Sequence, residues 1–162
     1  MKKNYLLLIM ALIIISCNDN DSEQDEYNYT FTENSDLKIF SYQADSYMKY
    51  GVIESGENLV FEYRFDAYDE ELIADDEYSE FIRFEIDSEL ESFSYSNEEL
   101  INIDLVFTKA CFCYFPMEES KDVSPKGMIS GEKISNEKWK IKIDLFFYGD
   151  DNRTIEGNFE LK

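Results

Sequence analysis

Three segments of the chain alternate apolar and mostly charged residues with a period of two, and this pattern constrains the fold more than any other feature. The segments are 59–66, 81–87 and 138–145. Because successive side chains of a strand point to opposite faces, each segment is predicted to be a strand with one buried and one solvent-facing side. Strands of this kind form antiparallel sheets that are covered on one face.

Turn-forming residues separate these strands from weaker candidates. Gly, Asn and Asp at 54–57 and 149–152 suit tight hairpins, and 135–137 does so less clearly. The longer connection 67–77 has the composition for a helical turn around Leu72 and Ile73. Weaker strand signals lie at 37–42, 47–53, 101–115, 127–135 and 153–161. About eight strands predict one all-β domain over 27–162, either an antiparallel β-sandwich or a small lipocalin-like β-barrel.

The first 17 residues have the layout of an export signal. Lys2 and Lys3 precede an apolar run, 5–15, which is too short to cross a hydrocarbon core of ~30 Å as a helix. The sequence Ile-Ile-Ser-Cys at 14–17 resembles the lipobox of bacterial lipoproteins. The resemblance implies cleavage after residue 16 and a lipid on Cys17, and hence a membrane-attached protein.

Residues 18–26 carry five acids and no apolar side chain, so they are predicted to form a disordered tether. Acids directly after a lipidated cysteine resemble the export signal of surface lipoproteins in the Bacteroidota. The closing segment 127–159 also resembles the C-terminal part of small outer-membrane lipoproteins of that group. These resemblances imply an outer-membrane protein displayed at the cell surface, with a periplasm-facing anchor as the alternative.

The mature chain is strongly acidic. Without residues 1–16 it has 13 basic and 36 acidic residues, a net charge of −23. Nucleic acid is therefore not expected as a partner, because its phosphates would be repelled. Basic proteins and neutral polymers such as glycans are the partners that this charge permits. Seventeen of the acids lie between Glu54 and Glu99, where Arg64 and Arg83 are the only bases.

The chain contains no histidine, which removes the commonest general base and a frequent metal ligand. No acid-rich segment has the spacing of a calcium-binding loop, and no pair of carboxylates is singled out for catalysis. We therefore expect neither an enzyme nor a cofactor or metal site.

Cys111 and Cys113 lie two apart in an apolar run, so on a strand their thiols would share one face. Parallel side chains of one strand satisfy the geometry of a disulfide badly. Buried free thiols, a strained disulfide and a functional thiol pair all stay open as alternatives.

The sequence favours a binding module that is displayed at the membrane and makes contact through an acidic surface. One alternative is an immunity or inhibitor-type protein that neutralises a basic toxin or enzyme through the same surface. The other is a carrier of a small apolar ligand, which requires a hollow barrel. The acids expected to form the contact surface are Asp66, Asp69, Glu70, Glu71, Asp75, Asp76 and Glu77.

Overall fold

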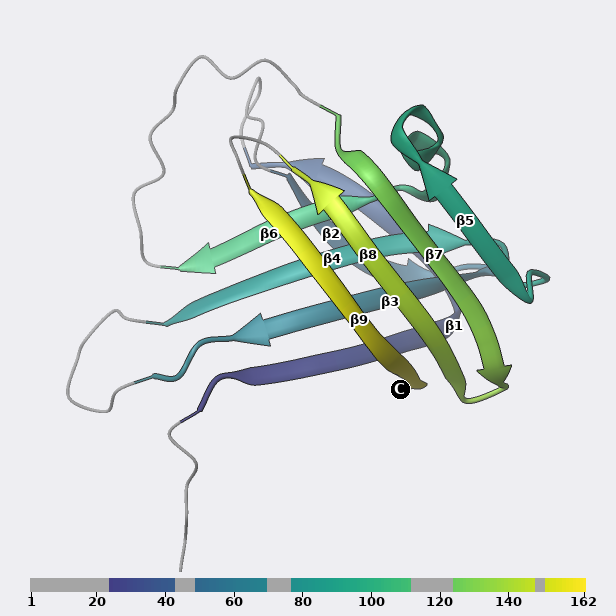
Figure 1. Ribbon diagram of the computed structural model, residues 1–162, viewed down its shortest axis with the longest axis horizontal. Coiled ribbons are helices and arrows are strands. Elements are labelled where there is room, and N and C mark those ends of the chain that lie inside the picture. The colour runs from purple at the N-terminus through teal and green to yellow at the C-terminus, as the bar shows by residue number, and fades with distance from the viewer. Residues whose placement is uncertain (1–23, 43–48, 70–76, 112–123, 148–150) are drawn as a thin grey trace, which may run out of the picture.

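The computed structural model describes residues 24–42, 49–69, 77–111, 124–147 and 151–162. Within them the chain is almost entirely β-structure, as the alternation predicts (Figure 1). The strands are β1 (Glu26–Ser41), β2 (Lys49–Ser55), β3 (Asn58–Asp66), β4 (Tyr78–Ile86), β5 (Ser92–Ser96), β6 (Val106–Cys111), β7 (Lys126–Ser135), β8 (Lys138–Phe146) and β9 (Asn152–Leu161).

The strands form two layers of one continuous sheet. One layer has the order β5-β7-β8-β9 and the other β1-β3-β4-β6, and β2 pairs with β1. A short parallel contact between β9 and β1, at Thr30↔Glu160 and Phe31↔Leu161, joins the layers. The sheet is open, with β5 and β6 at the ends of the strand order. The predicted all-β sandwich is therefore confirmed, and the alternative of a closed barrel is not.

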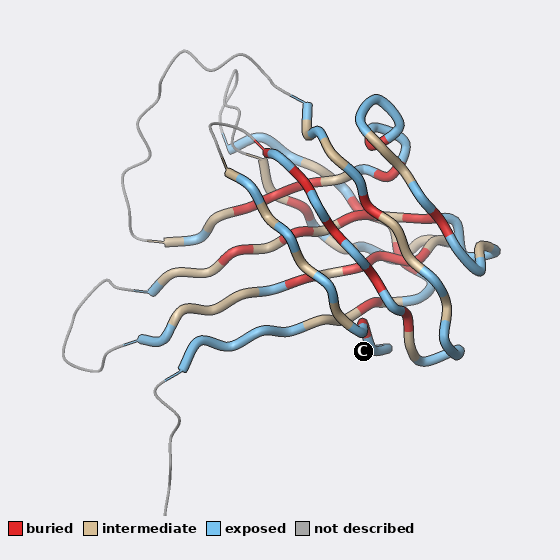
Figure 2. The backbone as a smooth tube through the Cα atoms, in the orientation of Figure 1, coloured by how far each residue is buried: buried red, intermediate tan, exposed pale blue. Residues whose placement is uncertain are grey.

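The core lies between the layers and is dominated by aromatic rings. Phe61 stacks on Phe84 with centroids 5.0 Å apart, and Trp139 of the opposite layer meets Phe61 edge-on at 5.5 Å. All three side chains are fully buried. Buried positions gather where the strands of the two layers cross (Figure 2). The alternating apolar residues of 59–66, 81–87 and 138–145 thus face inward, as their period predicts.

The predicted hairpin at 54–57 is wrong. β2 and β3 do not pair with each other but follow one another along the same partner, β1. Residues 26–32 of β1 pair with β3 and residues 35–41 with β2. The register shifts between these halves, where Asn34 has a φ of 52° and the Gly56 amide donates to the Asn34 carbonyl at 2.9 Å. Strands β1 to β3 therefore form one long antiparallel unit with a bend in its middle.

The distal half of this unit, residues 35–41 and 49–55, covers the outer side of the β3-β4-β6 layer. Leu37 from the ribbon packs there against Val60 and Val106, and all three are buried. Val60 is an apolar residue on the otherwise polar face of β3, so its exposure would be unfavourable. Bending the ribbon over this face removes Val60 from water. We call residues 35–41 and 49–55 the ribbon.

A second difference concerns residues 92–105. The strand predicted over 101–115 begins only at Val106, because Asn97–Ile103 form a short 3-10 helix. The Ser96 amide donates to the Glu99 side chain at 3.0 Å, which caps the start of this helix. Asp104, with a φ of 45°, ends it. Strand β5 directly precedes the helix and was not predicted.

The C-terminal meander forms as expected. A two-residue turn after Ser135 joins β7 to β8, and the β8–β9 hairpin closes around Phe147, whose amide donates to the Asp151 carbonyl at 2.8 Å. Two lysines of β8 pair with acids of β9, Lys138 with Glu160 and Lys140 with Glu156, both at 2.9 Å. The predicted helical turn at Leu72 and the segment 1–23 lie outside the described residues. No helix in the described part of the chain is long and apolar enough to span a membrane.

Candidate functional site

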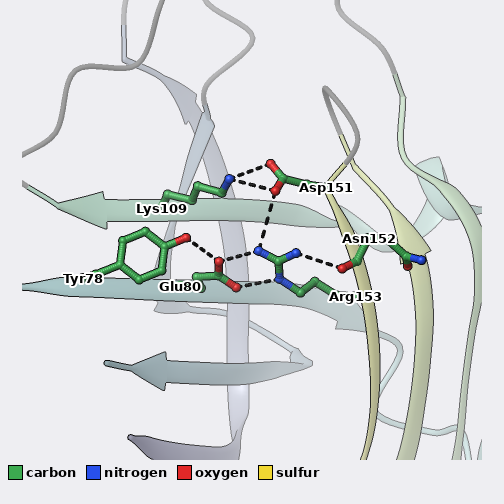
Figure 3. Close-up of polar contacts among 6 residues, drawn as sticks. All are labelled: Tyr78, Glu80, Lys109, Asp151, Asn152 and Arg153. Atoms are coloured by element: carbon green, nitrogen blue, oxygen red, sulfur yellow. Dashed lines mark hydrogen bonds and ion pairs between the residues drawn. The ribbon is translucent and has the colours of Figure 1, made fainter. Parts of the chain in front are cut away.

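A buried acid marks one end of the space between the layers. Glu80 on β4 occupies an inward position of the strand and is 6% exposed. Arg153 on β9 donates from Nε to Glu80 Oε2 at 2.7 Å and from Nη2 to Oε1 (Figure 3). The Tyr78 hydroxyl also donates to Oε1. Glu80 thus links Tyr78 of its own strand to Arg153 of the opposite layer.

A second charged pair lies beside the first. Lys109 on β6 contacts both carboxylate oxygens of Asp151, at 2.8 and 2.7 Å. Asp151 also lies 3.7 Å from Arg153 Nη2. The ring of Phe107 lies beneath both cations, 5.6 Å from Lys109 Nζ and 5.2 Å from Arg153 Cζ. We call Tyr78, Glu80, Lys109, Asp151 and Arg153 the end cluster.

The environment fixes the protonation states of the end cluster. Burial disfavours the ionised form of Glu80, but hydrogen bonds from Arg153 and Tyr78 outweigh it and hold the pKa of this carboxyl below its ordinary value. Burial and the same contact with Glu80 raise the pKa of the Tyr78 hydroxyl. Glu80 is therefore a charged acceptor and Tyr78 a neutral donor. Because each charge already has a partner, the end cluster is suited to holding the two layers together rather than to transferring protons.

No sequence motif singles out the end cluster, although two of its members carry a weaker signal. Glu80 falls on the same face of β4 as the apolar residues Ile82 and Phe84, because alternate residues of a strand share a face. Lys109 falls in the same way on the face of Phe107 in β6. A charged residue on an apolar face is costly to bury, so it needs either a partner of opposite charge or a place where the sheet edge is open to water. The partner Arg153 could not be found in this way, because it lies 73 positions further along the chain.

The outward face of the ribbon carries exposed aromatic side chains. Phe40 and Tyr42 are 45% and 52% exposed, and both rings contact Tyr50, with centroids 5.5 and 4.9 Å away. Val52 lies two pairs along in the register, on the same face as Tyr50, and is also exposed. We call Phe40, Tyr42, Tyr50 and Val52 the aromatic patch.

Acids gather directly beside this patch, at the bend of the ribbon. Asp36 pairs across the ribbon with Glu54, and its Oδ1 accepts from the Glu57 amide at 3.2 Å. The side-chain amide of Asn58 donates to both Asp36 and Glu85, at 3.3 and 2.8 Å. The described ion pairs give this group one base, Lys38, 3.7 Å from Asp36. The acidic corner, as we name it, consists of Asp36, Glu54, Glu57 and Glu85.

The acids predicted as a contact surface do not include this corner. Asp66 is partly buried and accepts from Ser79 at 2.6 Å and from Arg64 at 3.0 Å. Asp69 and Glu77 are exposed near the same end of the sheet, beyond β3 and before β4. β3 separates them from the acidic corner, so the acid-rich stretch 54–99 is divided between two ends of the molecule. Glu70, Glu71, Asp75 and Asp76 lie outside the described residues.

Of the three cysteines, only Cys111 falls within the described residues. It ends β6 on the inward face and is disulfide-bonded, so it is not a free thiol. The other two cysteines, Cys17 and Cys113, lie outside the described residues. Within the described ranges, no group of three or more Cys, Asp or Glu side chains is placed to hold a metal ion.

Comparisons with known proteins gave no match to a protein-family model, to a curated protein or to a solved structure.

Proposed function

We propose that this chain is a lipid-anchored, non-enzymatic binding module that holds a basic protein partner on the outward face of its ribbon. The observation that carries the proposal is the position of the aromatic patch directly beside the acidic corner. Along the ribbon, the pairs Asp36↔Glu54, Lys38↔Val52 and Phe40↔Tyr50 follow one another in register. Acidic and aromatic side chains therefore form one continuous surface.

Exposed aromatic rings supply the contact area of this surface. Tyr and Phe are enriched in the buried centres of protein interfaces, where they bury a large area at a low cost in side-chain entropy. The patch has no role in the core, because Leu37 and Ile53 make the inward contacts of the ribbon. An isolated exposed ring needs no explanation, but contiguous ones indicate an interaction surface.

Charge selects the kind of partner. Carboxylates around the patch attract Lys and Arg, and Arg side chains also stack on tyrosine rings. The chain as a whole carries a net charge of −21, which accelerates the encounter with a basic protein and repels an acidic one. Binding through this face should therefore weaken as the salt concentration rises.

Membrane attachment belongs to the same proposal. Glu26 begins β1, so the acidic segment after Cys17 leads directly into the folded domain. A lipid on Cys17 would concentrate the module at the outer membrane, and the acids of 18–26 favour the cell surface over the periplasm. Labelling cells with a palmitate analogue tests the anchor: the chain should be labelled, and Cys17→Ala should abolish the label and the membrane partitioning.

Site-specific photo-crosslinking in intact cells tests the binding surface. Benzoylphenylalanine would replace Phe40 in one variant and Phe146 in a control. Phe146 is a matched position, because it is 52% exposed and lies on the outer face of β8, away from the ribbon. We expect a discrete adduct with a basic protein from position 40 and none from position 146. Glu54→Lys in the position-40 variant should reduce its yield.

Two outcomes would contradict the binding proposal. Adducts of equal yield from positions 40 and 146 would indicate random collisions. An adduct from position 40 that contains an acidic protein, or that resists Glu54→Lys, would show that charge does not select the partner. The palmitate label is independent of both outcomes, so the anchor and the binding surface can fail separately.

A further inference from the structure

The inner face of the β1-β3-β4 layer changes from apolar and buried to polar and exposed along its length. Phe31 and Phe61 lie in the closed part, where they are 1% and 0% exposed. One step further along, Tyr29 pairs with Tyr63, and one step beyond that Tyr27 is 54% exposed. This face therefore emerges into solvent at the end that carries the end cluster.

The strand pairing explains why this end is open. β9 pairs with β1 only at Thr30 and Phe31, and the two strands diverge from this point in Figure 1. Residues of β1 before Thr30 have no partner on β9 within the described pairing. Among the described rings of β1 towards this end, Tyr29 is the last that contacts the opposite layer, where it meets Phe159 at 5.5 Å.

Three tyrosine hydroxyls on this face have no hydrogen bond to any described group: those of Tyr27, Tyr29 and Tyr63. Tyr63 is the most informative, because it is only 5% exposed. A buried hydroxyl without a partner is unfavourable, and most such groups in proteins are satisfied by protein, water or ligand. Burial, with smaller contributions from Tyr29 and Glu80, raises the pKa of Tyr63 to about 12, so its hydroxyl is a neutral donor and acceptor.

The charges near these hydroxyls balance. Glu80 is matched by Arg153, and Asp151 by Lys109. An anion would find both cations already paired and would approach a strongly acidic chain, and a cation would find both carboxylates occupied. A purely apolar ligand would leave the buried hydroxyl of Tyr63 without a partner. The ligand that fits is neutral, carries hydroxyl groups and presents apolar faces to aromatic rings.

We propose that this end of the interlayer face binds a sugar unit of a neutral glycan. A pyranose ring presents C–H groups on its faces and hydroxyls at its edge. The faces would contact the rings of Tyr27 and Phe65, whose centroids lie 5.2 Å apart. The edge would pair with the hydroxyls of Tyr29 and Tyr63. Few polar groups among aromatic side chains are typical of small-ligand sites. This site is separate from the ribbon, so it stands or falls independently of the protein partner.

Titration of the full chain in detergent with maltopentaose, mannopentaose and xylopentaose tests the proposal, with an oligogalacturonate as the charged comparison. Binding is followed by NMR, on the Nε–H signal of Arg153 and on labelled tyrosine rings. We expect at least one neutral sugar to shift the signals of Arg153 and Tyr63 at concentrations up to ~10 mM, a weak-affinity range. Trp139, buried in the closed core, should show no shift.

Two tyrosine variants localise the site. Tyr63→Phe should weaken sugar binding about fivefold, the value of one lost hydrogen bond. Because its hydroxyl has no protein partner, the variant should unfold at the same temperature as the parent chain or higher. Tyr95→Phe is the matched control, since Tyr95 lies in the other layer and stacks on Phe93 at 5.8 Å. It should leave binding unchanged.

Three results would overturn the proposal. The absence of shifts with every neutral sugar would remove the ligand class. Shifts with the oligogalacturonate alone would show that the site selects charge. Undiminished binding by Tyr63→Phe, in a variant that remains folded, would place the sugar elsewhere.

Discussion

Arg153 on β9 donates two hydrogen bonds to the carboxylate of Glu80 on β4, so a charged pair links the two layers of the sandwich near their open end. The two partners are unequally buried. The side chain of Glu80 is 7% exposed, whereas that of Arg153 is 24% exposed. Arg153 also keeps other acceptors, because it donates to the Asn152 carbonyl at 2.8 Å and lies near Asp151.

This asymmetry predicts unequal costs for the two partners. Arg153→Met leaves a buried carboxylate with only Tyr78 as a donor, so we expect a loss of about 3 kcal/mol in the free energy of unfolding. Glu80→Gln leaves a guanidinium that still has acceptors, so about 1–2 kcal/mol is expected. Urea unfolding measures both. Lys140→Met, which breaks an exposed pair, should produce no measurable change, and an equal loss there would contradict the argument.

Acid should weaken the chain through Glu80. The folded-state pKa of this carboxyl lies below its unfolded value, so its contribution is complete above the ordinary pKa of about 4.3 and is lost as pH falls through the folded pKa. The free energy of unfolding should therefore fall more steeply below pH 4 in the parent chain than in Glu80→Gln. Parallel curves for the two chains between pH 6 and 3 would contradict this prediction.

High pH should lower the free energy of unfolding through Tyr63, whose pKa is shifted in the opposite direction to that of Glu80. Burial raises its pKa to about 12, so the unfolded chain loses this proton first, near pH 10, and stability falls between pH 10 and about 12. Tyr63→Phe removes the titrating group. Its free energy of unfolding should therefore decline less than that of the parent chain between pH 9 and 11.

Replacing Gly127 by Ala should cost more stability than replacing Gly56, although both glycines lie against oxygen atoms. Its φ is +117°, and a Cβ would lie 2.1 Å from the backbone oxygen of Asp144. Gly127→Ala should cost about 3 kcal/mol, because neither the strained backbone nor the paired strand can move. At Gly56 a Cβ would meet the Asp36 carboxylate at 2.0 Å, but this side chain can rotate. Thermal unfolding should show a clearly smaller loss for Gly56→Ala.

Asn58 should hold the bend of the ribbon. Its side-chain amide donates to the carboxylates of Asp36 and Glu85, which would otherwise repel each other. Asn58→Ala should cost about 1–2 kcal/mol. Asn58→Asp adds a third carboxylate, so it should cost more in dilute buffer and recover partly in ~1 M salt. Hydrogen exchange at the Leu37 amide, which donates to Glu85, reports whether the ribbon has loosened. Unchanged exchange in Asn58→Asp would contradict this role.

The sequence predicted the strands whose two faces differ most. In 59–66, 81–87 and 138–145 the inward residues were identified correctly, because a period of two is a local property and one slip would expose every apolar side chain. β5 was missed although Phe93 and Tyr95 alternate with serines, because a period of two over only five residues is a weak signal. The bend at 54–57 was mistaken for a hairpin because Gly56 and its neighbours suit either, and only the pairing of both flanking strands with β1 distinguishes them.

The candidate sites divide in the same way. The sequence by itself determined the acidic charge, the alternation that makes the chain an all-β domain, and the lipobox-like segment at Cys17, which remains a prediction. Tertiary structure decided which acids lie together, that Glu80 meets Arg153, and that Phe40 and Tyr50 lie on the outward face of the ribbon. The physical reason is that charge and period are fixed by neighbouring residues, whereas ion pairs and patches depend on strands that are distant in the chain and meet only when the layers pack.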